Sequence, residues 1–328
     1  MTPVYSLVVP IFNEEAVLPV LLRRLDALLP QLDGPAEVII VDDGSLDTSP
    51  IVLEAKARAD ARYRFLRLSR NFGQQVAMTS GMARARGQAI VIMDADLQDP
   101  PEIILDMIAK WREGFEIVYA QRLSRDGESK FKLLTSNLFY RVMGNLSDVD
   151  IPRDVGDFRL VDRKALDSFL SMPERDRFVR GMFSWIGYRQ AVVQFHRPAR
   201  AAGETKYSLA KMLRLAASGL VSFSDAPLRA ALWIGLGVCG VALAYAVCVV
   251  AMWLFGANLA RGWSSIIVVM TFLGGANMLM TGVLGVYIGR IHTEVKRRPL
   301  YVVDRAIGFE APEAFEPVRE RELEAKRA

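Results

Sequence analysis

Two long stretches without a charged residue set the strongest limit on what this chain can fold into. No Asp, Glu, Lys or Arg occurs from Ala230 to Ala260, and none occurs from Gly262 to Gly289. Each stretch exceeds the roughly 20 residues that an α-helix needs to cross the hydrocarbon core of a bilayer. The pattern predicts two transmembrane helices, at about residues 233–255 and 265–288.

Composition supports a membrane part and excludes several other classes of protein. Hydrophobic residues make up 52% of the 328 residues, which is high for a purely soluble protein. The net charge of +4 is small for this length and gives no sign of nucleic-acid binding. Cys239 and Cys248 both lie inside the first predicted membrane helix, which excludes a disulfide framework or a thiolate metal site.

The basic residues around the two apolar stretches predict their orientation. Residues 1–5 lack the features of a secretory signal, so the N-terminal part is expected to stay where it is made. Basic residues flank the helix pair on its two outer sides: Arg229, Arg290, Lys296, Arg297 and Arg298. Only Arg261 lies in the connecting loop. The bias predicts a multi-pass protein of the inner (plasma) membrane with both termini in the cytoplasm.

The first 120 residues alternate between short apolar runs and segments of helical character. Strands are expected at residues 5–10, 37–42, 64–68, 89–94 and 115–120, and helices at 14–29, 48–59, 74–86 and 101–112. Such alternation predicts an α/β domain with a mostly parallel sheet and helices on both of its faces. Ligands of such sheets bind beyond the carboxyl ends of the strands.

The rest of the chain divides into further parts. Basic amphipathic helices are expected at residues 130–143 and 208–221, either in the lipid headgroup layer or packed on the sheet as ordinary surface helices. The predicted domains are therefore residues 1–228, the membrane helices within 229–290, and a cytoplasmic tail at 291–328. Residues 300–303 are a candidate edge strand that pairs between subunits of a homo-oligomer.

Two carboxylates follow the fourth predicted strand. Asp94 and Asp96 are two residues apart and can place oxygens around one divalent ion, which in turn can bridge the phosphates of a nucleotide diphosphate. Gln98 could add a neutral oxygen, and such hard ligands suit Mg²⁺ or Mn²⁺. The alternative is a turn or a helix cap, which most isolated pairs of this kind are, and Asp99 is expected to cap a helix that begins at residue 100 or 101.

A second carboxylate pair, Asp42 and Asp43, ends the second predicted strand. A carboxylate at that place can accept hydrogen bonds from a nucleobase N–H or from ribose hydroxyls. The alternative is a glycine turn at Gly44 with an aspartate cap.

Together these segments resemble the inverting family-2 glycosyltransferases with the GT-A fold, and more narrowly the polyprenyl-phosphate glycosyltransferases. The resemblance covers about residues 4–305. It rests on five segments in this order: Val9-Pro10-Ile11-Phe12-Asn13-Glu14-Glu15, Val41-Asp42-Asp43-Gly44-Ser45, Arg70-Asn71-Phe72-Gly73, Asp94-Ala95-Asp96-Leu97-Gln98 and Gly203-Glu204-Thr205-Lys206-Tyr207. The resemblance implies transfer of one sugar from a nucleotide diphosphate donor, with UDP-glucose preferred, to a polyprenyl phosphate such as undecaprenyl phosphate.

The resemblance also implies roles for individual residues. The residues around the nucleotide base and ribose are Pro10, Asn13, Glu14 and Asp43, and the metal ligands are Asp94, Asp96 and Gln98. The residues at the lipid phosphate are Arg122, Lys132 and Ser136. Lys132 and Ser136 are one helical turn apart, although Lys132 could instead extend to the headgroups without a ligand. Lys206 closes over the diphosphate, and Arg200 either assists it or is a solvated loop charge.

Asp157 matches the family position proposed as the catalytic base. A phosphate monoester has a second pKa near 6, so the acceptor is largely a dianion at neutral pH and needs little proton removal. Asp157 could therefore position a substrate or stabilise an oxocarbenium-like transition state instead. A purely structural alternative is an ion pair with Arg153 or Arg159.

Two other functions are weighed against this reaction. A processive polysaccharide synthase is disfavoured because residues 177–185 lack the Gln-x-x-Arg-Trp motif and because only two membrane helices are expected. A non-catalytic membrane adaptor or lipid-flipping subunit is disfavoured by the intact carboxylate set and by the absence of intramembrane charge.

Overall fold

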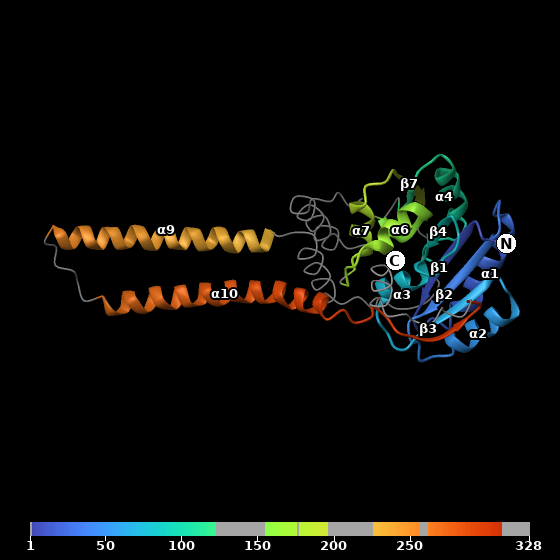
Figure 1. Cartoon of the computed structure of the whole chain (residues 1–328), viewed down its shortest axis with the longest axis horizontal. Helices are drawn as coiled ribbons and strands as arrows, with labels where there is room; N and C mark the ends of the chain where they lie inside the picture. The colour runs from blue at the N-terminus through green and yellow to red at the C-terminus, as the bar shows by residue number, and fades with distance from the viewer. Residues whose placement is uncertain (1, 123–154, 176, 196–225, 256–261, 310–328) are drawn as a thin grey trace, which may run out of the picture.

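The computed structural model describes residues 2–122, 155–175, 177–195, 226–255 and 262–309 (Figure 1). Strands of the described residues form one mixed sheet in the order β7-β5-β6-β4-β1-β2-β3-β8. Their bounds are Tyr5–Ile11 (β1), Ala36–Asp42 (β2), Tyr63–Leu68 (β3), Ala89–Ile92 (β4), Ile117–Arg122 (β5), Val155–Asp162 (β6), Gln190–Phe195 (β7) and Val303–Ile307 (β8). The five predicted strands are confirmed, with shifts of a few residues at their ends.

Helices cover both faces of the sheet. On one face lie α1 (Leu18–Leu28), α2 (Ser49–Ala59) and α4 (Ile103–Arg112), and on the other lie α3 (Gln74–Met82), α6 (Arg163–Ser171) and α7 (Val179–Trp185). A short 3₁₀ turn, η1 (Leu29–Gln31), follows α1. The predicted α/β class with two helical layers is confirmed.

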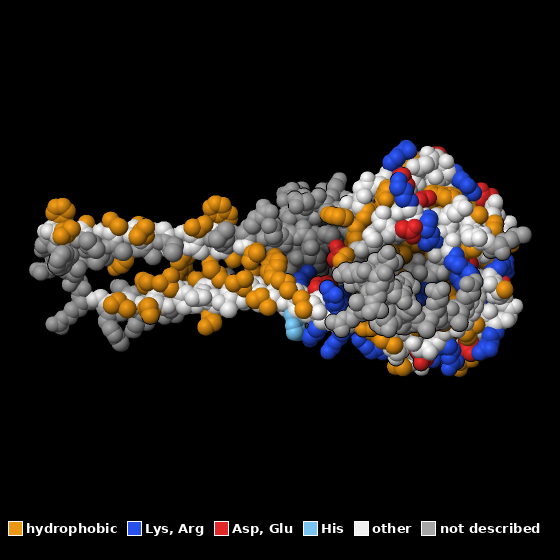
Figure 2. All heavy atoms as spheres, in the orientation of Figure 1, with side chains coloured by type: hydrophobic (Ala, Val, Ile, Leu, Met, Phe, Trp, Pro, Cys, Tyr) orange, Lys and Arg blue, Asp and Glu red, His pale blue; other side chains and the backbone are white. Residues whose placement is uncertain are grey.

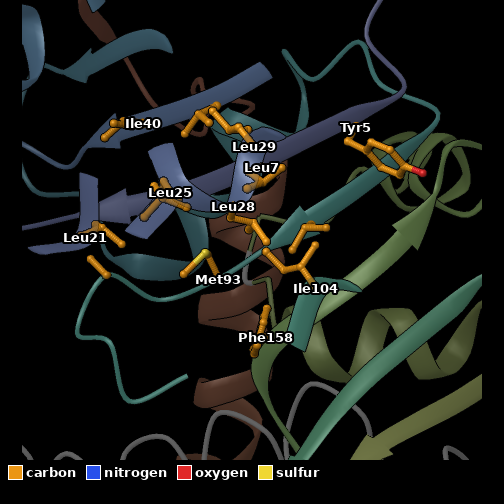
Figure 3. Packing of buried hydrophobic residues seen from close by; sticks show 14 of the residues in the cluster. Tyr5, Leu7, Leu21, Leu25, Leu28, Leu29, Ile40, Met93, Ile104 and Phe158 are labelled. Atoms are coloured by element: carbon orange, nitrogen blue, oxygen red, sulfur yellow. The ribbon is translucent and has the colours of Figure 1, made fainter. Parts of the chain in front are cut away.

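The apolar spacing of α1 explains why this helix forms on the sheet. Leu18, Leu21, Leu25 and Leu28 recur every three or four residues, so they share one face of the helix, and all four are buried. In Figure 3 the last three of them lie among core residues such as Leu7 of β1, Ile40 of β2 and Met93, which follows β4. The core thus fixes the strands, and the strands in turn fix the loops at their ends.

Strand direction places the loops that matter. Strands β1 to β4 run parallel, whereas β6 pairs antiparallel with both β4 and β5. The N-terminal end of β6 therefore reaches the same edge of the sheet as the C-terminal ends of β1, β2, β4 and β5. The sequence pattern did not predict this reversal.

Two long helices extend from one end of the α/β domain and lie side by side (Figure 1). They are α9 (Ala226–Leu254) and α10 (Trp263–Val295), so both predicted apolar helices are confirmed as helices. Hydrophobic side chains are exposed along both (Figure 2). Among the described residues, one helical segment is long and apolar enough to cross a membrane, Phe272–Val295, and a shorter apolar segment spans Trp233–Tyr245. A two-helix membrane anchor stays a prediction.

The chain returns from α10 to the sheet through β8. This strand begins at Val303 and pairs antiparallel with β3, with Phe65 opposite Ile307. The expected strand at residues 300–303 therefore starts later, and it lies at the edge of the sheet beside β3 of the same chain. Its pairing between subunits stays a prediction. A homo-oligomer stays a prediction. The base of α10 contacts the domain where the Arg175 backbone N–H donates to Glu294 Oε1 at 2.8 Å.

Candidate functional site

The register of β4 and β6 brings two predicted site residues together. In this pairing Val91 lies opposite Leu160, and Ile92 lies opposite Arg159. Continuing the same register by two residues brings Asp94 opposite Asp157. Both side chains are on the sheet face that carries α3 and α7, because Ile90, Ile92 and Asp94 alternate onto one side of the strand. Two carboxylates that are 63 positions apart in the sequence thus come near each other, and the charge of Asp157 contributes to raising the pKa of Asp94.

Asp94 lies near several other carboxylates. Its Oδ1 accepts a hydrogen bond of 2.7 Å from Nε2 of Gln74, the first residue of α3. Burial, together with the neighbouring carboxylates of Asp157, Asp99 and Asp96, raises the pKa of Asp94 to about 7. The solvent-exposed area of Asp94 is intermediate, so we attribute much of this shift to repulsion between the carboxylates.

The turn after β4 holds the other two predicted metal ligands. Asp96 Oδ1 accepts from the backbone N–H of Gln98 at 3.1 Å, and Leu97 between them has a positive φ of 57°. The side chain of Gln98 is buried. Within the described part of the chain, no three His, Cys, Asp or Glu side chains are arranged as a ready metal centre. Convergence of Asp94, Asp96 and Gln98 on one cation therefore stays a prediction.

The predicted cap at Asp99 is wrong. Helix α4 begins at Ile103, and its N-cap residue is Glu102, which makes no side-chain cap. Asp99 is instead 1% exposed and contributes to the repulsion at Asp94. The residue types of this turn suit a hard divalent cation, because Asp94, Asp96 and Gln98 offer carboxylate and amide oxygens, and a cation would offset the repulsion that raises the pKa of Asp94.

Asp157 is held by two arginines. Its side chain is 4% exposed. Arg180 of α7 donates from Nε to Oδ1 at 2.7 Å and from Nη2 to Oδ2 at 3.2 Å. Arg159 Nη2 lies 3.5 Å from Oδ1, which confirms the expected ion pair with Arg159. Arg153, the other expected partner, lies outside the described residues. A carboxylate held in this way is fixed in its orientation, because a guanidinium group bonds to both of its oxygens.

Arg180 is a residue of this site that the sequence did not predict. It lies in the 177–185 segment, which lacks a processive motif, and its basic character was the only available signal. Arg159 is fully buried, and burial lowers the pKa of its guanidinium. Its Nη2 donates to the backbone oxygen of Gly156 at 3.1 Å, which anchors the start of β6.

Asp42 and Asp43, at the end of β2, bind backbone N–H groups of neighbouring loops. Both oxygens of Asp43 accept from backbone N–H groups, Oδ1 from Phe72 at 2.7 Å and Oδ2 from Gly73 at 2.8 Å. Asp42 Oδ1 accepts from the N–H of Ser45 at 3.0 Å. Burial raises the pKa of both aspartates. The predicted contact of Asp43 with the nucleotide stays a prediction, while its observed contacts hold the loop that precedes α3.

A glycine turn after β2 is confirmed. Gly44 has a φ of 73°, and a Cβ atom there would lie 2.5 Å from the backbone carbon of Arg70. Only glycine fits this close approach without displacing the backbone. The predicted alternative for this segment, a glycine turn stabilised by aspartate, is therefore correct.

The predicted base-binding residues lie on the adjacent loop. Asn13 has a φ of 53°, and its N–H donates to Ser45 Oγ at 2.9 Å. Asn13 Oδ1 accepts from the N–H of Leu46 at 2.8 Å, so the loops after β1 and β2 are joined side by side. Pro10 lies within β1, and the N–H of Glu14 donates to Ser49 Oγ at 3.3 Å. The structure brings these residues to the same sheet edge as Asp94.

Of the other predicted site residues, the structure places only Arg122. Arg122 is the last residue of β5, so its backbone lies at this same edge. The remaining predicted contacts lie outside the described residues: Lys132, Ser136, Arg200 and Lys206, together with the amphipathic helices at 130–143 and 208–221.

Comparison with known proteins identifies the family of this chain. The model of the family "Glycosyl transferase family 2" matches residues 6–170. The chain is 46% identical over 306 residues to the uncharacterized glycosyltransferase YkcC of Bacillus subtilis, covering 93% of this chain and 95% of the relative. It is 38% identical to the bactoprenol glucosyl transferase of Shigella phage SfII, covering 92% of this chain and 97% of the relative.

A solved structure of glucosyl-3-phosphoglycerate synthase from Mycobacterium tuberculosis is also similar. It has a TM-score of 0.47 and 22% identity, and the match covers 67% of this chain and 79% of that one. The match to the family model and the identity to full-length relatives decide the assignment. With its GT-A-like α/β domain, the chain belongs to glycosyl transferase family 2 and is a glycosyltransferase.

Proposed function

We propose that this protein transfers a single sugar from a nucleotide diphosphate sugar to a polyprenyl phosphate at the cytoplasmic face of the inner membrane. The observation that carries the proposal is the meeting of Asp94 and Asp157 at the sheet edge where the loops after β1 and β2 also lie. Relatives named bactoprenol glucosyl transferase support a polyprenyl phosphate acceptor and glucose as the sugar. UDP-glucose is the proposed donor, and undecaprenyl phosphate is the proposed acceptor.

The reaction is a displacement with inversion. An oxygen of the acceptor phosphate attacks the anomeric carbon, the bond from that carbon to the diphosphate oxygen breaks, and the electron pair leaves with the nucleoside diphosphate. If the donor is UDP-α-glucose, the product is a β-glucosyl phospholipid. The acceptor is largely dianionic at neutral pH, since its second pKa is about 6. Asp157 therefore does not need to remove a proton from most acceptor molecules. Held by Arg180, it acts chiefly through its position and its negative charge.

Asp94, Asp96 and Gln98 would hold Mg²⁺ or Mn²⁺ at the donor diphosphate. When bound, such a cation offsets the negative charge that develops on the leaving group. Gln74 keeps Asp94 oriented for this role through its hydrogen bond to Oδ1. We further propose that Lys206 and Arg200 close over the diphosphate.

The acceptor would enter from the side of the long helices. Arg122, Lys132 and Ser136 are the proposed contacts of the lipid phosphate. In this proposal α9 and α10 cross the membrane, and the exposed Lys296, Arg297 and Arg298 mark the cytoplasmic side. Such an arrangement holds the domain at the bilayer surface, where a water-soluble donor can meet a lipid acceptor.

The proposal is tested with membranes that contain the full-length protein. These are incubated with labelled nucleotide sugars and undecaprenyl phosphate, with and without Mn²⁺, and the lipid is extracted. We expect label from UDP-glucose in the lipid fraction, and only when the cation is present. Label in a polymer would indicate a processive synthase, and nucleotide binding without transfer from any donor would indicate a non-catalytic adaptor. Either result would overturn the proposal.

A further inference from the structure

Two residues from different helices converge on Asp157. Arg180 of α7 contacts both carboxylate oxygens, and Gln75 Nε2 of α3 lies 3.4 Å from Oδ2. Gln75 also accepts, through Oε1, from the N–H of Val179 at 3.1 Å. Gln75 thus joins the first residue of α7 to the carboxylate that α7 itself holds. We call Arg180 and Gln75 the Asp157 clamp.

The clamp matters because of what Asp157 faces. The β4–β6 pairing ends at Ile92 and Arg159, and continuing it by two residues would place Asp157 opposite Asp94, at the Cβ separation of about 5 Å that directly opposed residues have. An uncommitted carboxylate at that distance from a cation held by Asp94 would be drawn into its ligand set. In this structure both Asp157 oxygens are engaged by a guanidinium fork, whose geometry matches a carboxylate and fixes its orientation.

We propose that Arg180 is a positioning residue that keeps Asp157 out of the cation's ligand set. This inference rests on the proposed function, since it assumes a divalent cation at Asp94 and Asp96. Asp157 then stays paired with Arg180 beside the cation, and its negative charge acts on the sugar and the acceptor instead of on the metal. Asp157 is buried, whereas the side chain of Arg180 is 32% exposed. Arg180 can therefore be replaced without opening the hydrophobic core.

The test counts the water molecules on bound Mn²⁺ by pulsed electron paramagnetic resonance in isotopically labelled water. It uses the purified full-length protein with UDP. In Asp157→Asn the count should equal that of the wild type, because Asp157 is not a ligand. In Arg180→Met the count should fall by one as Asp157 enters the ligand set, and turnover should fall at least tenfold. In the double variant Arg180→Met with Asp157→Asn the count should return to the wild-type value.

The matched control is Arg58→Met, which removes an arginine paired with Glu54 on α2, away from the site. It should change neither the water count nor turnover. If Arg180→Met does not fold, Arg180→Lys keeps the charge, loses the two-point contact and carries the same test. An unchanged water count in the folded Arg180 variant, or an altered count in Asp157→Asn alone, would overturn the inference while the proposed function stands. If the wild type binds no Mn²⁺ even with UDP, the proposed function and the inference both fail.

Discussion

Asp43, directly after β2, and Asp94, after the end of β4, have different surroundings. Asp43 has a backbone N–H group on each oxygen, supplied by Phe72 and Gly73. Asp94 has one side-chain amide, from Gln74, and faces further carboxylates, Asp157 among them. The first arrangement satisfies negative charge with the protein's own donors. The second concentrates negative charge at one place.

This difference separates a structural use of aspartate from a functional one. A carboxylate whose oxygens are both engaged by buried backbone donors stabilises the loop that supplies them. Carboxylates that repel one another destabilise the metal-free fold, and a cation removes that cost. Substitutions at the two places should therefore change different properties of the protein.

The largest expected effect is on turnover at the β4 end. Replacing Asp96 by Asn removes one charged ligand, and we expect turnover to fall by about 10³-fold, a change of about 4 kcal/mol in the activation free energy. Insertion into the membrane should stay unchanged, and the thermal unfolding temperature should not fall. The check is single-sugar transfer measured beside a melting curve of the same preparation. Near-normal transfer would remove Asp96 from the cation site.

The next effect is on stability at the β2 end. Replacing Asp43 by Ala leaves the N–H groups of Phe72 and Gly73 without their acceptors, and we expect the free energy of unfolding to fall by about 3 kcal/mol. For a domain of this size the unfolding temperature should drop by roughly 6–12 °C. Thermal denaturation of the purified protein measures it. Asp94→Asn is the matched control and should not lower the unfolding temperature of the metal-free protein.

The sequence predicts much of the fold because the fold depends on local patterns. Alternating apolar runs predict the α/β class, the first five strands and helices α1 to α4, including α1 with its leucine face, but not α6 and α7. The two long uncharged runs predict α9 and α10 as helices. Partners across the sheet are non-local, so the antiparallel insertion of β6 and the pairing of β8 with β3 could not be predicted from periodicity.

The acids of the candidate site stand out in the sequence, but the arginine that pairs with Asp157 does not. Asp94, Asp96 and Asp157 stood out because each follows or lies within a recognisable segment. The closeness of Asp94 and Asp157 depends on the β4–β6 register, which no local pattern encodes. Arg180 contacts Asp157 from a separate helix, 23 positions further along the chain. The spacing of the two residues in the sequence does not predict this contact.

A smaller effect is expected from the second residue that holds Asp94. Gln74→Ala removes the hydrogen bond to Asp94 Oδ1, and loss of such a supporting contact should weaken Mn²⁺ binding by about 10-fold to 100-fold. Titration with Mn²⁺ in the presence of UDP measures the change. Gln31→Ala is a matched control, because Gln31 donates to the backbone oxygen of Ala27 far from the site. Equal affinities in both variants would mean that Gln74 does not support the cation site.

The smallest effect is the dependence of cation binding on pH. Mn²⁺ needs the ionised form of Asp94, whose pKa is raised to about 7, so affinity should fall by up to about tenfold per pH unit below 7 and level off above it. Titrations between pH 5.5 and 8.5, a range chosen about one and a half units either side of that pKa, measure the profile. An affinity that does not vary with pH would show that Asp94 is not a ligand.

The same pKa shift affects the stability of the metal-free protein. The pKa of Asp94 in the folded state lies above its ordinary value of 3.8, so the folded protein retains a proton that the unfolded chain releases. Stability should therefore decline as pH rises from about 4 to about 7, and Asp94→Asn should flatten that part of the profile. Chemical denaturation across this pH range measures both slopes. A wild-type profile already flat between these values would contradict the shift.

The most direct test of the central claim is the number of Mn²⁺ ions bound in the presence of UDP. Equilibrium titration followed by electron paramagnetic resonance should give one ion per chain for the wild type and for Asp42→Asn. The same titration should show no comparable binding for Asp96→Asn. If Asp96→Asn binds Mn²⁺ as tightly as the wild type, the acids at the end of β4 do not form the cation site, and the account is wrong.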